Sequence, residues 1–196
     1  MTLARRESPV VAWTLLVAGV VSVLYAWQIR QPLTSSDFTI LYTSARNPPE
    51  RMYQPPPGAR VNMSPPIAWS DVPAGTKSIA VVCEDPDAGN PPPFVHWVIY
   101  NIPAAARALP ENIPFEPSAP MPASIAGSIQ GVSGFRRPIY RGPAPPPGKV
   151  HHYHFVVYAL DVDRLQAGLT RADLLDAING HILAQGELVA TYERKP

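Results

Sequence analysis

The chain has 196 residues, enough for one domain with a sizeable hydrophobic core. Its formal net charge of +1 gives no general electrostatic footprint for nucleic acid. Its single cysteine, Cys83, excludes an internal disulfide and a thiolate metal cluster, and its place in an apolar run indicates a small buried side chain. The 26 prolines are scattered between apolar runs, which favours a loop-rich β fold over a disordered tract.

The first predicted element is a membrane-spanning helix over residues 10–27. This stretch contains no charged residue and is close to the minimum length that crosses a bilayer as a helix. Arg5 and Arg6 precede it, and tryptophan and tyrosine rings lie towards its ends, where they favour the membrane interface. The positive flank predicts that residues 1–9 stay in the cytoplasm and that the chain after the helix lies outside it.

A cleaved signal peptide is the alternative interpretation of the same segment. The apolar stretch is longer than the usual apolar region of a signal peptide, and no clean A-x-A cleavage site follows it. The pattern therefore favours a single-pass protein of the cytoplasmic (inner) membrane over a secreted or periplasmic one. Residues 28–36 follow as a short linker.

After the linker, residues 37–196 read as one β-rich domain. Residues 62–75 are predicted to form a loop that carries Trp69. The strongest apolar runs are rich in Val, Ile, Tyr and Phe and are bounded by Pro or Gly, as strands are. Strands are predicted at residues 38–42, 78–84, 96–102, 153–161 and 187–192.

A helix is predicted late in the chain. Thr170 is a good N-cap, and Asp173 stands three residues later, as in a capping box. Apolar residues recur at helical spacing from 174 to 178, and Gly180 is a typical stop. Several strands and one late helix together predict a mainly β fold, a β-sandwich with short peripheral helices.

Polar residues gather where two of the predicted strands begin. Side chains alternate between the two faces of a strand, so His151 and Tyr153 are presented together while His152 and His154 point to the opposite face. A pocket lined by His96, His151 and Tyr153 is therefore geometrically coherent. A site that uses residues 151, 152 and 154 together is not.

The same alternation applies to the strand at residues 96–102. It predicts that His96 shares a face with Val98 and Tyr100. We also expect apolar residues from three strands to lie in one sandwich core, namely Val81, Val98, Phe155 and Val157.

Two carboxylates and a glycine complete the candidate pocket. Asp85 and Asp87 flank a proline that fixes the local backbone. They suit a site in which one of them orients a histidine, or in which the ligand carries an ammonium or hydroxyl beside its phosphate. The alternative is that both merely cap turns. Gly142 allows the backbone to approach a ligand closely.

Other chemistries find less support in the sequence. His152 and His154 share a strand face, but no third ligand stands near them, so no metal site is predicted. No serine or cysteine has a neighbouring base that would activate it as a nucleophile. No phosphate-loop or dinucleotide fingerprint is present, and no cofactor is predicted.

These residues resemble the phosphatidylethanolamine-binding proteins, specifically the bacterial branch called Raf-kinase-inhibitor-like. The similarity covers roughly residues 38–194 and rests on blocks in the family's order, at residues 64–70, 72–77, 85–88, 96–103, 142–146, 151–153, 158–161 and 180–184. The resemblance implies a central β-sandwich with a small anion pocket for phosphate, phosphorylethanolamine or related head groups. Matched residue by residue, the ligand-binding positions are Asp85, Asp87, His96, Gly142, His151 and Tyr153.

The chain also departs from the family pattern. Gly89 stands where the family has a proline, Ala144 where the bacterial branch has a cysteine, and His152 where an arginine precedes the pocket tyrosine. Residues 134–139 add basic charge near the pocket loop, and the predicted membrane segment sets the chain apart from soluble members.

The leading functional hypothesis is a non-enzymatic binding module outside the cytoplasm that accepts a small phosphorylated or carboxylated ligand. Because members of the family inhibit kinases or proteases, the resemblance also implies an alternative, the regulation of a partner protein by direct contact. A third hypothesis is a hydrolase that uses Asp87 and His96 as an acid–base pair.

Overall fold

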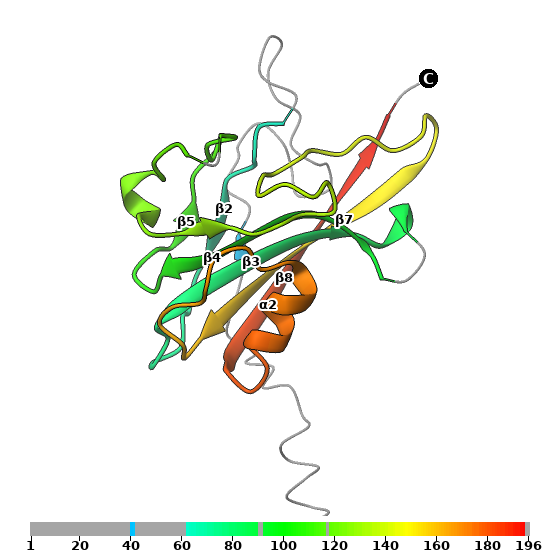
Figure 1. Cartoon of the computed structure of the whole chain (residues 1–196). Helices are drawn as coiled ribbons and strands as arrows, with labels where there is room; N and C mark the ends of the chain where they lie inside the picture. The colour runs from blue at the N-terminus through cyan, green and yellow to red at the C-terminus, as the bar shows by residue number, and fades with distance from the viewer. Residues whose placement is uncertain (1–39, 42–61, 90–91, 117, 195–196) are drawn as a thin grey trace, which may run out of the picture. The chain divides into compact units, whose positions relative to one another are not determined.

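The computed structural model describes residues 40–41, 62–89, 92–116 and 118–194. Within these ranges the chain forms two antiparallel β-sheets, one α-helix and two short 3-10 helices (Figure 1). The larger sheet has the strand order β6 (Ile129–Gln130), β4 (Phe94–Pro103), β3 (Ser78–Asp85), β7 (Val150–Leu160) and β8 (Ile182–Glu193). The smaller sheet has the order β1 (Ile40–Leu41), β2 (Ile67–Trp69) and β5 (Ala108–Leu109).

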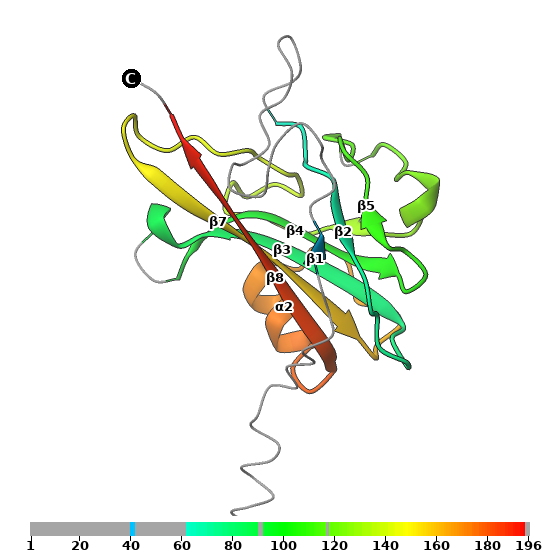
Figure 2. The ribbon, with the colours of Figure 1, turned by 180° about the vertical axis from the view of Figure 1, so that it is seen from behind.

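The two faces of the larger sheet are buried by different partners. One face packs with residues of the smaller sheet to form the main core, in which Trp69 and Leu109 join Trp97 and Phe155. The other face packs against α2 (Arg171–Ala177), which lies in front of the larger sheet in Figure 1 and behind it in Figure 2. Burial on both faces explains why β3 and β4 are nearly continuous apolar runs.

The stronger sequence predictions are confirmed. The central strands β3 and β4 occupy the predicted runs with one or two more residues at their ends. β7 begins three residues before the predicted start and ends one residue before the predicted end, and β8 is longer than predicted. The helix begins with the predicted capping box: the Thr170 side chain accepts from the Asp173 backbone N–H, and the Asp173 carboxylate accepts from the Thr170 backbone N–H. The mainly β sandwich with a peripheral helix is therefore the fold of the described residues.

The shortest strands were not predicted. The loop expected at residues 62–75 contains β2, which pairs with both β1 and β5. Strands β5 and β6 are two residues long, and a run this short carries no measurable alternation. The strand predicted at residues 38–42 is present as β1. These pairings depend on neighbours that are distant in sequence.

Among the described residues, no helix is long and apolar enough to cross a membrane. The predicted spanning segment at residues 10–27, the cytoplasmic residues 1–9 and the linker at 28–36 all lie outside the described ranges.

One core assignment from the sequence is wrong. Val81, Phe155 and Val157 lie in the main core as expected, but Val98 packs on the opposite face, with Tyr100 and Leu174 of the helix side. Val98 follows Trp97 on β4, and neighbouring residues on a strand point to opposite faces. The larger sheet thus has a hydrophobic core on each of its two faces, whereas the sequence prediction placed these residues in a single core.

Val157 gives a direct test of the main core. Its side chain is completely buried, so we expect Val157→Ala to lower the free energy of unfolding by about 1–3 kcal/mol through lost contacts and a residual cavity. Chemical denaturation measures this change. Val189→Ala is a matched control, because Val189 is 39% exposed and its truncation should cost under about 0.5 kcal/mol. Equal losses in the two variants would contradict the assignment of this core.

Candidate functional site

Asp85 is the buried carboxylate at the end of the central strand β3. Its side-chain Oδ1 accepts hydrogen bonds from the backbone N–H groups of Asp87 at 2.9 Å and Ala88 at 3.1 Å, which caps the 3-10 helix η1 (Pro86–Ala88). Its Oδ2 accepts from His151 Nδ1 at 2.8 Å. The sequence left open whether this carboxylate caps a turn or orients a histidine, and Asp85 does both.

His151 and Tyr153 lie side by side on β7, as the alternation of side chains predicted. Both are buried on the face that contains the main core, whereas His152 is exposed. His154 also points away from this face, and its Nδ1 donates to Glu187 at 2.7 Å. The structure therefore separates the cluster of three histidines at residues 151–154 as expected.

His96 reaches this site because β4 contains a bulge. Cys83 pairs with Trp97 but Glu84 pairs with Val95, so His96 is an extra residue in the ladder. Its Nε2 lies 4.0 Å from Asp85 Oδ2, and its ring meets that of Tyr153 edge-on at 5.1 Å. Strict alternation placed His96 on the face of Val98, and that prediction is wrong because the bulge re-aims the side chain.

The tautomer of neutral His96 follows from the hydrogen bond that its ring Nδ1 makes. Nδ1 donates to the backbone carbonyl of Arg141 at 2.8 Å, and a carbonyl oxygen can only accept. The neutral ring therefore carries its proton on Nδ1 and presents Nε2 as an acceptor. Burial lowers the pKa of His96 below its ordinary value of 6.5, and this effect outweighs the opposing hydrogen bond to Arg141 and the nearby charge of Asp85.

Tyr153 is a neutral group within the same cluster. Burial raises the pKa of its phenol well above the ordinary value of 10.0, and the charge of Asp85 together with a hydrogen bond to that carboxylate raises it further. The phenol therefore stays protonated throughout the physiological range and contributes a donor but no charge.

Asp87 lies at the rim of the site and has a different partner. Its Oδ2 accepts from both the backbone N–H and the ring Nδ1 of His152, each at 2.8 Å. The side-chain hydrogen bond from His152 is the main cause that lowers the pKa of Asp87. The hydrogen bonds that hold the Asp87 carboxylate thus come from His152 and not from His96.

These residues surround a pocket of about 370 Å³. All six positions predicted from the sequence line it, namely Asp85, Asp87, His96, Gly142, His151 and Tyr153. Gly142 belongs to the loop after β6, and its backbone N–H donates to Asn62 Oδ1 at 3.4 Å. Residues from β3, β4, β7 and two loops therefore converge on one small polar cavity.

An aromatic wall closes one side of the pocket. Phe94 and Phe135 meet edge-on at 4.9 Å, and the guanidinium of Arg141 lies 4.5 Å from the centre of the Phe135 ring. Gly134 allows this loop to approach so closely, since a Cβ there would lie 3.0 Å from the carbonyl oxygen of Val95. The sequence showed basic charge in this loop, but nothing in it indicated that Phe94, Phe135 and Lys149 line the pocket.

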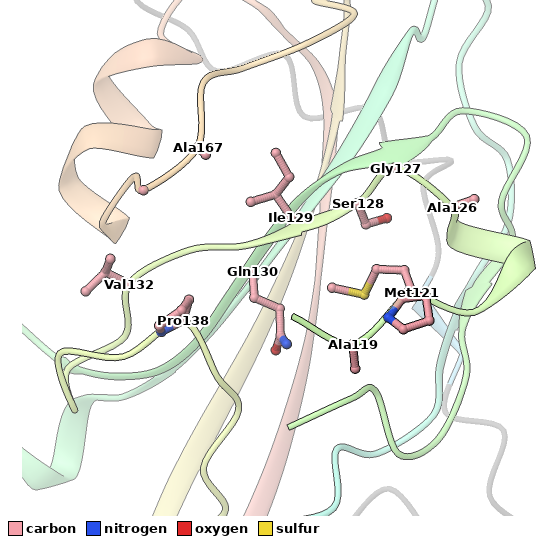
Figure 3. A pocket seen from close by; sticks show the side chains of 12 residues that line it. Ala119, Met121, Ala126, Gly127, Ser128, Ile129, Gln130, Val132, Pro138 and Ala167 are labelled. Carbon is pink, nitrogen blue, oxygen red and sulfur yellow. The ribbon is translucent and has the colours of Figure 1, made fainter. Parts of the chain in front are cut away.

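A larger cavity of about 570 Å³ lies elsewhere, beside the edge strand β6 (Figure 3). No ionisable side chain lines it, and its polar groups are already engaged. Gln130 accepts from Trp97 Nε1 and donates to the carbonyl of Pro114, both at 2.8 Å, and Ser128 donates to the carbonyl of Ile125. The smaller pocket is therefore the candidate site, because only there do titratable groups converge.

The described residues form neither a metal site nor a reactive thiol. None of their His, Cys, Asp and Glu side chains form a group of three that could hold a metal ion. Cys83 is buried in the main core, and burial raises the pKa of its thiol well above 9.0, which makes it unreactive.

The fold and pocket define a class, a β-sandwich domain with a small cavity lined by acids and histidines at one end of its larger sheet. The sequence pattern of the family described as phosphatidylethanolamine-binding protein matches residues 37–193. The chain therefore belongs to the phosphatidylethanolamine-binding protein family.

Relatives with known sequences and structures agree with this assignment. A UPF0098 protein of Methanothermobacter thermautotrophicus is 43% identical over 134 residues, which cover 68% of this chain and 84% of the relative. Escherichia coli YbhB is 39% identical over 133 residues, which cover 67% and 82% of the two chains. The crystal structure of Escherichia coli YbcL, described as a new member of the mammalian PEBP family, has a TM-score of 0.67 at 30% identity and covers 81% of this chain and 99% of YbcL.

The buried neutral state of His96 predicts a pH dependence of stability. The unfolded chain takes up a proton at His96 near pH 6.5, whereas the folded protein resists it until a lower pH. This contribution to stability is fully present above about pH 6.5 and is lost as the pH falls through the folded pKa. We expect His96→Asn, whose amide can still donate to the Arg141 carbonyl, to show a flatter stability curve below that pH.

Urea denaturation of both proteins between about pH 5 and pH 8 measures the effect. The control is His181→Asn, because His181 is an exposed histidine paired with Asp161 on the surface. Parallel curves for the wild type and His96→Asn would contradict a lowered pKa at His96.

Proposed function

We propose that this chain is a non-enzymatic binding module whose pocket takes phosphate or a small phosphorylated ligand such as a head group. The observation that carries the proposal is the convergence of His96 and His151 with the orienting carboxylate of Asp85 on a pocket of about 370 Å³. A cavity of this size suits a small ligand. Imidazole, phenol and ammonium groups are donors that oxyanions use.

Positive charge at the pocket supports an anionic ligand. Lys149 lines the cavity, and Arg141 holds its guanidinium against the Phe135 ring that also lines it. Protonation of His96 would add a second donor, since Nδ1 is already committed to the Arg141 carbonyl. Basic groups near a small polar cavity raise the local concentration of anions.

The composition of the pocket favours binding over turnover. Its described lining contains no serine, threonine or cysteine side chain that could attack a substrate. The Asp85 carboxylate accepts hydrogen bonds from His151 and from the backbone of η1, and the Asp87 carboxylate accepts from His152. The polar residues thus hold one another in place, as expected for a preformed binding site.

The ligand class is supported by the family and by the pocket together. The family is named for binding phosphatidylethanolamine, and the pocket of this chain combines basic groups with the carboxylates of Asp85 and Asp87. A phosphorylated ligand that also carries an ammonium or hydroxyl would use both kinds of group.

Substitution of the two histidines tests this proposal. We expect His96→Ala and His151→Ala each to weaken phosphate binding by about 1.5–3 kcal/mol, the value of a hydrogen bond to a charged group. Wild-type affinity should also rise as the pH falls towards the lowered pKa of His96, because a protonated imidazole donates through Nε2. Calorimetry with phosphate and phosphorylethanolamine measures both effects.

His154→Ala is the matched control, because His154 lies on the opposite face of β7 and pairs with Glu187. Its phosphate affinity should equal that of the wild type. Equal affinity in all three variants, or an equal loss in His154→Ala, would place the binding site elsewhere.

We further propose that residues 10–27 hold the domain at the cytoplasmic membrane, with the domain on the outer side. Support comes from the uncharged stretch itself, the preceding Arg5 and Arg6, and the lack of an A-x-A cleavage pattern. N-terminal sequencing of protein extracted from membranes should then find the segment still attached. A mature chain that begins near Gln28 would show that the segment is a cleaved signal peptide.

A further inference from the structure

Two hydrogen-bond acceptors face each other inside the pocket. His96 Nε2 and Asp85 Oδ2 are 4.0 Å apart, and the two residues are only 5% and 1% exposed. Nε2 is an acceptor in the neutral ring because Nδ1 donates to the Arg141 carbonyl. The Asp85 carboxylate has only acceptor oxygens. A ligand that sits against both atoms must therefore bring a donor to at least one of them.

We infer that this pocket selects oxyanions that carry a proton: inorganic phosphate and phosphate monoesters, whose P–OH group donates to the Asp85 carboxylate or to His96. The inference rests on the proposed function and names its ligand class more narrowly. It assigns Asp85 the role of a specificity-determining residue, in addition to its contacts with His151 and η1.

The physical reason is the repulsion between two negative charges in a buried site. A fully deprotonated oxyanion would place its oxygens against the Asp85 carboxylate and the acceptor Nε2 of His96 with no proton between them. Sites built to bind a hydroxyl reject analogues that lack it by large factors, because their buried polar groups lose a partner. Sulfate has the shape of phosphate but holds no proton at neutral pH.

Phosphate monoesters can supply the required proton. Their second ionisation has a pKa of about 6. A carboxylate that accepts a hydrogen bond from the P–OH group can therefore stabilise the monoprotonated form at neutral pH. The lowered pKa of His96 keeps its ring neutral there, so the proton has to arrive with the ligand. Lys149 in the pocket lining provides attraction for the remaining negative charge.

The same logic separates a free phosphate or monoester from a phospholipid head group. A phospholipid is a phosphodiester, which has no P–OH group at neutral pH. An ethanolamine head group could still offer its ammonium as the donor. Dimethyl phosphate and glycerophosphorylethanolamine are probes for these two cases, since both are diesters and only the second carries an ammonium.

Calorimetry on the full chain in detergent solution at about pH 7 tests the inference with four probes: inorganic phosphate, sulfate, dimethyl phosphate and glycerophosphorylethanolamine. We expect phosphate to bind at least about tenfold more tightly than each of the other three. In Asp85→Asn the side chain can still cap η1 through its oxygen, and its amide N–H can donate to sulfate. The preference for phosphate over sulfate should then fall towards one.

Glu187→Gln is the matched control, because it removes a carboxylate that pairs with His154 and does not line the pocket. It should keep the wild-type preference for phosphate over sulfate. A thermal melt of each variant shows whether it folds. If Asp85→Asn does not fold, the ratio of phosphate to sulfate affinity in the wild type still tests the inference.

The possible outcomes separate this inference from the proposed function. Equal wild-type affinities for phosphate and sulfate would overturn the selection for a protonated ligand while leaving an anion pocket in place. Tight binding of glycerophosphorylethanolamine without binding of dimethyl phosphate would overturn it in favour of an ammonium donor. Binding of none of the four probes would overturn the proposed function itself.

Discussion

The carboxylate of Asp85 is the group on which the rest of the site depends. A buried charge is costly unless it is paired and hydrogen-bonded, and here every interaction that compensates it also positions a functional residue. One oxygen ends β3 by capping η1, which fixes the turn that carries Asp87. The other oxygen holds the His151 ring, and burial together with the Asp85 charge keeps the phenol of Tyr153 protonated.

The bulge in β4 is the second constraint. In a regular strand His96 would point to the helix side of the larger sheet, with Val98 and Tyr100. The extra residue in the ladder turns His96 to the side of Asp85 while Trp97 stays in the main core. A strand can in this way contribute one side chain to a pocket and the next to the hydrophobic core.

The loop after β6 links the basic rim of the pocket to its interior. The Arg141 carbonyl fixes the tautomer of His96, and the Arg141 guanidinium lies over Phe135 in the aromatic wall. A shift of this loop would therefore alter both the shape of the pocket and the hydrogen-bonding character of His96. Arg141 thus acts on the pocket through its backbone carbonyl as well as through its side chain.

The sequence by itself determined the central strands, the capped helix and six of the residues that line the pocket. Apolar runs bounded by Pro and Gly identify strands locally, a capping box needs only neighbouring residues, and alternation separated His151 and Tyr153 from His152 and His154. The tertiary structure decided the rest. The short strands β2, β5 and β6 exist only through distant pairing, and the bulge at His96 appears only when β4 is laid against β3. The choice of partner for Asp85 and Asp87 was likewise set by which histidine of β7 the folded chain brings within reach, because a carboxylate's neighbours in space cannot be read from its neighbours along the chain.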